Sequence, residues 1–188
     1  MILHFSMSLD GYIAGPAVSA EHPMGRGGER LHEWLFSENK SAVDIESARE
    51  MRDAVGAVVL GKRTFDVGIG LWQGTPYAVP CFVLTHAARD DLVQSNGTFV
   101  FVTGGIESAV RHARASAGGK DVVIMGAEMA RQALKAGLVE VINLQLVPVL
   151  LGSGSRLFEP QDGAMRKLEC IRAVESPLVA HLRYRVVR

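Results

Sequence analysis

The first positions of the chain alternate between apolar and polar side chains. Within residues 2–9, Leu3 and Phe5 fall on one face, whereas His4 and Ser6 fall on the other. Successive side chains of a β-strand point to opposite faces, so a period of two is typical of a strand. We therefore predict a strand over residues 2–9, ended by the Asp-Gly pair that follows it.

Short, continuous apolar runs bounded by glycine recur later in the chain. Such runs are typical of strands buried on both faces, and they span residues 57–61, 81–85, 99–105 and 121–126. Apolar residues at helical spacing occupy residues 45–55, 106–113 and 130–138. Strand, helix and strand in succession predict parallel pairing through right-handed crossovers. We therefore expect an α/β fold with a mostly parallel central sheet flanked by helices.

The carboxyl-terminal part breaks this alternation. Residues 141–151 and 180–187 both have the pattern of a strand, and no full helix lies between them. They predict an antiparallel pair, which makes the sheet mixed. Residues 15–30 and 68–80 are rich in glycine and proline and lack periodicity, so we expect long loops there. Loops of this length are often functional, although a tolerated insertion is the alternative.

Composition narrows the class of protein. A chain of 188 residues has the size of one ordinary domain, so we expect a single domain over residues 1–188. The 20 basic and 20 acidic residues balance, which argues against binding to nucleic acid or to an anionic membrane surface. No apolar stretch is long enough to span a membrane, and the first residues lack the pattern of a secretory signal. We therefore expect a cytoplasmic protein.

The two cysteines lie far apart in sequence, in apolar surroundings. Neither Cys81 nor Cys170 has another cysteine or a histidine at the spacing of metal ligands. We expect both to be reduced core residues, and we expect no metal site.

Glycine ends several of the predicted strands. Gly61, Gly104 and Gly126 each come at the end of an apolar run, before a helix or polar residues. A residue without Cβ lets a phosphate approach the backbone, and the start of the following helix can hold the anion. A plain strand-to-helix turn is the alternative for each glycine alone, but all three in one sheet favour a nucleotide site.

Basic and hydroxyl side chains follow two of these strand ends. Lys62, Arg63 and Thr64 come directly after one strand, and Thr85 and His86 follow another, with Arg89 close behind. Cationic side chains beside hydroxyl donors suit a phosphomonoester. A solvated basic loop is the alternative interpretation.

The order of these motifs along the chain resembles that of a known family. The chain is similar to the dihydrofolate reductase-like proteins, and most of all to the branch of the reductase domain of bacterial riboflavin biosynthesis. The resemblance covers nearly the whole chain, and it is carried by "SMSLDGYIAG", "AVVLGKRTF", "VPCFVLTHAAR", "FVFVTGGIESAV", "VVIMGAEMARQAL" and "LQLVPVLLGSGSRLF". It implies a three-layer α/β sandwich with a mixed, mostly parallel sheet, and NADPH bound across the strand ends.

The resemblance also implies a role for individual residues. It implies that Lys62, Arg63 and Thr64 meet the adenosine-side phosphates, that Thr85 and His86 lie near the 2′-phosphate, and that residues 102–105 border the adenine. The residues implied to bind the cofactor are Ile13, Ala14, Gly61, Lys62, Arg63, Thr64, Leu84, Thr85, His86, Thr103, Gly104, Gly126, Ala127, Glu128, Met129, Leu151 and Gly152. Gly126 would come closest to the pyrophosphate, whereas Ile13, Ala14, Leu151 and Gly152 would approach the nicotinamide.

The sequence offers fewer candidates on the substrate side. Folate reductases anchor the pterin with an acidic residue on the first helix, and no carboxylate of this chain aligns with it; those within range are Glu29, Glu33, Glu38 and Asp44. Asp10 is the best polar candidate for a catalytic role, with a turn-forming role as the alternative.

Some other side chains could line a substrate site. Trp34 and Phe36 could wall a cleft or pack in the core, and the core is favoured. Asn143 and Gln145 share a strand face and could bind a heterocycle or lie in an interface.

The function expected from this resemblance is reduction of a small pterin-like, pyrimidine-like or other heterocycle by hydride from NADPH. The zinc deaminase signature that accompanies this reductase in bifunctional riboflavin enzymes does not occur in the sequence, so we expect the reductase part without the deaminase. A nucleotide-binding or dimerising module that lacks efficient catalysis is the alternative. We also expect a homodimer, with the apolar strand at residues 144–151 as a candidate interface.

Overall fold

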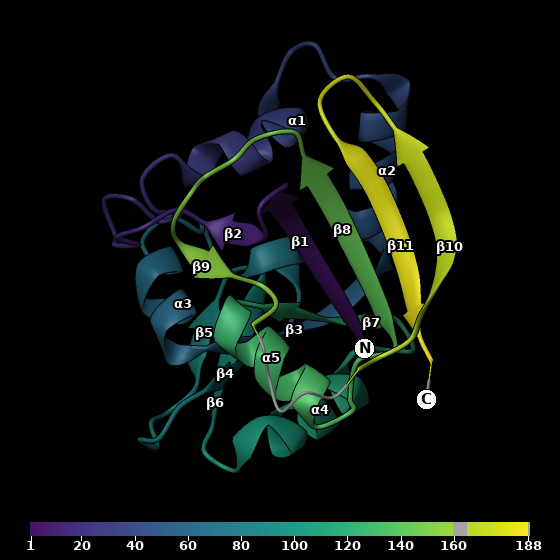
Figure 1. Cartoon of the computed structure of the whole chain (residues 1–188). Helices are drawn as coiled ribbons and strands as arrows, with labels where there is room; N and C mark the ends of the chain where they lie inside the picture. Colours follow the sequence, from purple (N-terminus) through teal and green to yellow (C-terminus); the bar gives the residue numbers. More distant parts are fainter. Residues whose placement is uncertain (160–164, 188) are drawn as a thin grey trace. The chain divides into compact units, whose positions relative to one another are not determined.

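The computed structural model describes residues 1–159 and 165–187 (Figure 1). The chain divides into two compact units, and each is assembled from segments that are discontinuous in sequence. Unit 1 comprises Met1–Ile2 and Arg52–Leu138, and unit 2 comprises Leu3–Met51 and Val139–Arg188. The expectation of a single domain stays a prediction.

The strands of unit 1 form a mostly parallel sheet in the order β7-β3-β4-β6-β5. Their bounds are Val55–Gly61 for β3, Cys81–Leu84 for β4, Leu92–Gln94 for β5, Gly97–Val102 for β6 and Asp121–Met125 for β7. Val58 of β3 is in register with Cys81 on one side and Val123 on the other, both in parallel strands. The short strand β5 pairs antiparallel with β6. The apolar runs therefore form the predicted parallel strands.

Helices connect these strands. They are α3 at Lys62–Gly68, α4 at Gly105–Ser116 and α5 at Ala127–Lys135, with a 3₁₀ turn at Pro76–Ala78. Helix α4 buries Ala109, Val110 and Ala113, which form one stripe at helical spacing. The periodicity of the sequence therefore predicted α4 and α5 correctly, and α4 connects the parallel strands β6 and β7.

The core of unit 1 is apolar on both faces of β3. Val58 and Leu60 are fully buried and pack with Phe65 of α3 and Phe99 of β6. The rings of Phe65 and Phe99 meet edge to face, with centroids 5.1 Å apart. Each such side chain contributes about 1.5–3 kcal/mol by leaving water. This packing holds the carboxyl end of β3 and the start of α3 in place.

The main sheet of unit 2 has the strand order β10-β11-β8-β1. The bounds are Ile2–Ser8 for β1, Val141–Val147 for β8, Leu168–Glu175 for β10 and Ala180–Val186 for β11. Strands β8 and β11 are antiparallel, with Leu144 opposite Leu182, as the sequence predicted. Two short strands, β2 at Tyr12–Ala14 and β9 at Ser155–Arg156, form a separate antiparallel pair.

The helices of unit 2 precede β3 in the chain. They are a 3₁₀ helix at Gly28–His32, α1 at Glu33–Phe36 and α2 at Ala42–Ala54. Trp34 is buried and packs with Leu31, Ala48 and Val147, so the favoured core interpretation of this residue is confirmed. Phe36 is 76% exposed and does not belong to that core.

Some features of the fold differ from the expectation. Strand β10 was not predicted, and its side chains are mostly exposed. Cys170 lies on this strand and is exposed, so its prediction as a core residue is wrong, whereas Cys81 is buried as predicted. The strand predicted over residues 141–151 ends at Val147, because Pro148 has no backbone N–H for a sheet.

None of the described helices is both long and apolar enough to cross a bilayer.

The predicted dimer contact falls on β8 and the residues after it. Within unit 2, β8 lies between β11 and β1, so neither of its backbone edges is free for a second copy. Leu150, just beyond the strand, is 72% exposed. The homodimer stays a prediction, and any contact at residues 144–151 would have to use side chains rather than strand pairing.

Candidate functional site

Unit 1 holds one set of candidate residues, at the starts of three helices. Helices α3, α4 and α5 follow β3, β6 and β7, and their N-cap residues are Gly61, Gly104 and Gly126. None of these glycines can donate or accept through a side chain, and no side-chain cap bonds these helix starts in the described part of the chain. Their first backbone N–H groups are therefore available to an external anion, which the positive end of the helix dipole also favours.

Gly126 is required at its position by both conformation and space. Its φ is +93°, a region that residues with a Cβ rarely adopt. A Cβ at Gly126 would lie 2.6 Å from the Thr64 Oγ1, well inside van der Waals contact. The fold thus brings Thr64 of α3 next to the start of α5. The resemblance assigns Thr64 to the adenosine-side phosphates and Gly126 to the pyrophosphate, and the structure places these two residues side by side.

The next residues of α5 have different surroundings. Met129 is buried, and a Cβ at Gly61 would lie 3.4 Å from the Met129 Cγ, so Met129 packs beneath the start of α3. Glu128 is exposed and accepts hydrogen bonds from Gln132 and Arg131, which lower the pKa of its carboxyl. Its negative charge would repel a phosphate, so the groups of Ala127, Glu128 and Met129 that suit an anion are backbone N–H groups.

The basic side chains that directly follow β3 and β4 are exposed. Lys62 pairs with Asp66 at 2.5 Å, one turn further along α3, whereas Arg63 and His86 lie at the surface. Thr103 and Gly104 are exposed after β6, and Leu84 is half-buried at the end of β4. The carboxyl ends of β4 and β6 are in register, so the residues after them emerge at one edge of the sheet.

Thr85 has a local structural role. The side chain is only 8% exposed, and its hydroxyl oxygen accepts a hydrogen bond from the Ala87 N–H at 3.3 Å. A hydrogen bond between a threonine hydroxyl and a nearby backbone N–H forms a local turn, which shapes the loop after β4. The implied contact of Thr85 with a 2′-phosphate would have to form alongside this bond.

Arg89 is a basic residue whose surroundings only the tertiary structure reveals. Its guanidinium carbon lies 4.3 Å from the ring centroid of Phe101 and 5.8 Å from that of Phe65. The cation is thereby held over aromatic faces at the surface of unit 1. The sequence places Arg89 after a strand, but nothing in its spacing predicts rings from β6 and α3 beneath it.

A second set of candidate residues surrounds Asp10 in unit 2. The Asp10 carboxylate accepts hydrogen bonds from the Ser8 hydroxyl at 2.6 Å, the Leu151 N–H at 3.1 Å and the Gly152 N–H at 2.7 Å. The Ser8 bond is the largest cause that lowers the pKa of Asp10 to about 2, and the two backbone bonds add to it. Asp10 is therefore ionised at neutral pH.

Arg156 and Tyr12 complete this arrangement, and sequence reasoning missed both. Arg156 donates to the backbone oxygen of Asp10 at 3.1 Å and to the Tyr12 hydroxyl at 3.0 Å. Its guanidinium carbon also lies 4.4 Å from the centroid of the Tyr12 ring. The pairing of Tyr12 with Arg156 across β2 and β9 places them together. Only the weak alternation in "GYIAG" and "SGSRLF" could have indicated these strands.

The residues implied at the nicotinamide end lie around the same turn. Ile13 and Ala14 belong to β2, while Leu151 and Gly152 are bonded to Asp10. A Cβ at Gly154 would lie 2.0 Å from the backbone oxygen of Ala14, so only glycine fits there. Unit 2 therefore brings Ala14 and the Gly-Ser-Gly turn into contact.

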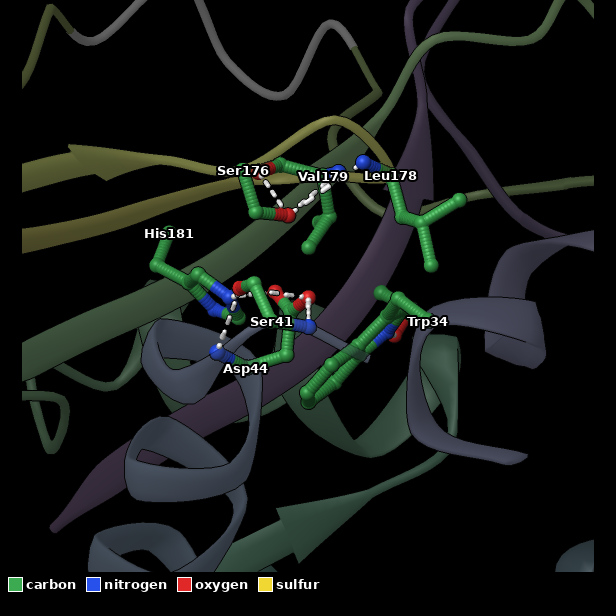
Figure 2. A network of polar contacts seen from close by, with 8 residues as sticks. Trp34, Ser41, Asp44, Ser176, Leu178, Val179 and His181 are labelled. Carbon is green, nitrogen blue, oxygen red and sulfur yellow. Dashed lines mark hydrogen bonds and ion pairs between the residues drawn. The ribbon is translucent and has the colours of Figure 1, made fainter. Parts of the chain in front are cut away.

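The acidic candidates on the first helices differ in exposure. Glu29, Glu33 and Glu38 are exposed, whereas Asp44 is fully buried at the start of α2. The oxygens of Asp44 are bonded to Ser41 and His181 (Figure 2). Asp44 is thus part of the interior of unit 2, with its hydrogen-bonding positions taken by the protein.

Asn143 and Gln145 point to the interior side of their strand. The Asn143 amide nitrogen lies 2.5 Å from the His4 Nε2, and Gln145 is 6% exposed opposite His181. Neither side chain is presented to solvent as an open interface would require. Among the described residues, no group of three or more His, Cys, Asp or Glu side chains is placed to hold a metal ion.

Comparison with known proteins agrees with this architecture. The structure resembles that of a protein from Shewanella sp. PV-4 named for riboflavin biosynthesis, with a TM-score of 0.75 and 22% identity, over 100% of this chain and 98% of that one. It resembles a diaminohydroxyphosphoribosylaminopyrimidine deaminase/5-amino-6-(5-phosphoribosylamino)uracil reductase from Thermotoga maritima, with a TM-score of 0.64 and 14% identity, over 99% of this chain and 56% of that one. It also resembles dihydrofolate reductase from Enterococcus faecalis, complexed with NADP(H), with a TM-score of 0.57 and 13% identity, over 100% of this chain and 96% of that one.

These likenesses define the fold class. The predicted α/β dihydrofolate reductase-like sandwich, with a mixed and mostly parallel sheet flanked by helices, is confirmed. Residues 1–179 match the family described as the RibD C-terminal domain, and the chain belongs to that family. None of the curated proteins compared with the chain matches it significantly.

Proposed function

We propose that this protein is an NADPH-dependent reductase of a small heterocycle related to a pyrimidine or a pterin. The observation that carries the proposal is the start of α5, where Gly126 combines an uncapped helix N-terminus with a space that a Cβ would fill. Membership of the RibD C-terminal domain family and the likeness to dihydrofolate reductase support the same function.

The residues of unit 1 fit the phosphates of NADPH. The backbone N–H groups at the starts of α4 and α5 would take the pyrophosphate, because they have no side-chain cap in the described residues. The exposed cations Lys62 and Arg63 would attract the 2′-phosphate, which distinguishes NADPH from NADH. The Thr64 hydroxyl beside Gly126 would add a donor at the pyrophosphate.

In such a reaction the protein mainly has to bind and orient the cofactor and the substrate. Reduced nicotinamide supplies the hydride when NADPH is bound, so no protein nucleophile is needed. The residues expected at the nicotinamide end, Ala14, Leu151 and Gly152, would orient the ring and exclude water. Asp10 is a poor proton donor at neutral pH, because hydrogen bonds hold its pKa at about 2.

Two neighbours support the substrate class by their names. The Thermotoga protein is a reductase of 5-amino-6-(5-phosphoribosylamino)uracil, and the Enterococcus protein reduces dihydrofolate. Both substrates are nitrogen heterocycles with amide-like edges, which hydrogen-bonding groups recognise. We therefore place the substrate of this chain in the same chemical class.

Calorimetric titration with NADPH and NADH, side by side, tests the cofactor assignment. We expect NADPH to bind more tightly, because NADH lacks the 2′-phosphate that Lys62 and Arg63 would attract. Oxidation of NADPH would then be followed by absorbance, with 5-amino-6-(5-phosphoribosylamino)uracil and dihydrofolate as probe substrates. Failure to bind either nucleotide would overturn the proposal and favour a module without reductase activity.

A further inference from the structure

The Asp10 carboxylate uses both oxygens to hold one short stretch of backbone. Its Oδ1 accepts from the Leu151 N–H at 3.1 Å, and its Oδ2 accepts from the Gly152 N–H at 2.7 Å. The Ser8 hydroxyl donates to Oδ1 at 2.6 Å and fixes the rotamer of the carboxylate. One side chain therefore binds two consecutive peptide groups that are more than a hundred residues away in sequence.

Besides the Asp10 bonds, the bound segment is restrained by the Tyr12 hydroxyl, which donates to the Gly152 oxygen at 3.4 Å, and by the Leu151 side chain, which packs against the core of unit 2. The segment follows β8, and before it the Leu9 N–H donates to the Val149 oxygen at 2.9 Å. Leu150 is exposed, and Gly152 has a φ of +72° in the left-handed region. A segment with an exposed side chain and a left-handed glycine has several accessible conformations, so hydrogen bonds must select one. Asp10 supplies two of them.

The backbone of Asp10 is itself held. The Arg156 guanidinium donates to the Asp10 oxygen at 3.1 Å, and the Leu157 N–H donates to the Gly11 oxygen at 3.2 Å. Arg156 is anchored in turn on the ring and hydroxyl of Tyr12. The carboxylate therefore projects from a braced turn, which makes it suitable for setting the position of another segment.

We propose that Asp10 is a positioning residue of the reductase site, which holds the Leu151–Gly152 backbone through its ionised carboxylate and transfers no proton. The inference rests on the proposed function, because Leu151 and Gly152 are the residues expected beside the nicotinamide. Asp10 is not among the phosphate-binding groups. Its loss should therefore lower turnover, while the affinity for NADPH changes little.

The test compares Asp10→Asn with the wild-type protein. An asparagine keeps the size of the side chain but turns an NH₂ group toward one of the two backbone N–H groups, so one bond is replaced by repulsion. Asp10→Glu retains the charge and can restore part of the contact. Asp91→Asn is the matched control, because Asp91 is exposed and lies outside the proposed site.

We expect Asp10→Asn to lower kcat for NADPH oxidation by about 10- to 100-fold, with the probe substrate that the wild type accepts. The dissociation constant for NADPH should stay within about two-fold of the wild type. Asp10→Glu should recover part of the kcat, and Asp91→Asn should match the wild type. An unchanged kcat, or a loss confined to NADPH affinity, would overturn the inference.

A second measurement needs no substitution and guards against a variant that fails to fold. Scalar coupling through the hydrogen bond, between the Gly152 amide nitrogen and the Asp10 carboxyl carbon, reports the contact directly by NMR. Its absence in the folded wild type would overturn the inference on its own. If the coupling is present but the wild type binds no NADPH, the proposed function fails first, and the assignment of Asp10 to a reductase site falls with it.

Discussion

The Asp44 carboxylate and the His181 imidazole form a buried hydrogen bond, with Oδ1 and Nε2 2.9 Å apart (Figure 2). The other oxygen of Asp44 accepts from the backbone and hydroxyl of Ser41, while the Ser41 hydroxyl oxygen accepts from the Asp44 N–H. Ser41 and Asp44 thus form a reciprocal cap at the start of α2. Burial raises the pKa of Asp44, but bonds from His181, Ser176 and Ser41 outweigh it and lower the pKa overall.

Replacement of Asp44 by alanine should destabilise the protein by about 2–4 kcal/mol. The change removes a helix cap, which contributes about 1 kcal/mol, and leaves His181 buried without its partner, which costs about 1–3 kcal/mol more. Urea denaturation followed by circular dichroism measures the loss. Ser41→Ala removes part of the cap but leaves the Asp44–His181 bond, so it should cost less. Equal losses in the two variants would contradict a structural role for that bond.

Stability should fall as the pH drops from about 6.5 to about 4, because His4 stays neutral in the folded protein. Burial, and then the charge of Arg183, lower the pKa of His4 from 6.5 to about 4. The unfolded chain therefore takes up a proton in this range before the folded chain does, which costs up to about 3 kcal/mol of stability at the lower end. Above about pH 6.5 the contribution of His4 is complete.

Urea midpoints at a series of pH values measure this dependence. His4→Gln should flatten the slope between pH 4 and 6.5. The remaining slope should include a part from half-buried His32, because desolvation lowers the pKa of that side chain too. His22→Gln is the control, because it replaces a histidine that is exposed. A slope unaffected by His4→Gln would show that His4 does not titrate in this way.

Substitution of Gly126 by alanine should weaken NADPH binding more than its cost in stability explains. The new Cβ would meet the Thr64 Oγ1 and would occupy the approach to the first turn of α5. The positive φ alone costs about 1 kcal/mol. Gly119→Ala is a matched control, since Gly119 has a φ of +82° and no atom within 4 Å of a Cβ. Gly126→Ala should lose more stability than Gly119→Ala, because its Cβ also meets Thr64, and only Gly126→Ala should lose affinity in calorimetric titration. Equal affinities would argue against this helix start as the phosphate site.

Removal of the two cations after β3 should affect NADPH far more than NADH. In the double variant Lys62→Ala/Arg63→Ala, we expect the affinity for NADPH to fall about 10- to 100-fold, since charge-assisted bonds to a phosphate contribute about 1.5–3 kcal/mol. The affinity for NADH should change little. Arg185→Ala removes an exposed cation that pairs with Glu169 and serves as the control. Equal losses for the two nucleotides would contradict the 2′-phosphate assignment.

The strands with a strong apolar signal were predictable, and the exposed ones were not. The fully buried side chains of β3 form a continuous apolar run, so the sequence identifies that strand directly. Strand β10 is held by backbone pairing to β11, and its mostly exposed side chains leave no such run in the sequence. Its prediction would have needed knowledge of β11 as a partner.

Some residues of the candidate site were likewise predictable from sequence, and others were not. Gly126 could be found from sequence, because a strand-ending glycine before a helix is a local signal that its positive φ explains. Arg156 could not be found, because its contacts with Tyr12 and Asp10 exist only after two distant segments pair as β2 and β9. Thr85 could be named from sequence, but only the structure shows that its hydroxyl is engaged within its own loop.

The sequence by itself determined the order of the main strands and helices, the mixed character of the sheet and the glycines at the strand ends. These features depend on local periodicity and backbone freedom, which neighbouring residues encode. Only the tertiary structure decided that Asp10 binds the Leu151 and Gly152 backbone and that Asp44 faces His181. A hydrogen bond forms only when donor and acceptor lie within about 3 Å of each other. Residues far apart in sequence meet this condition only after folding, so the sequence pattern does not indicate such pairs.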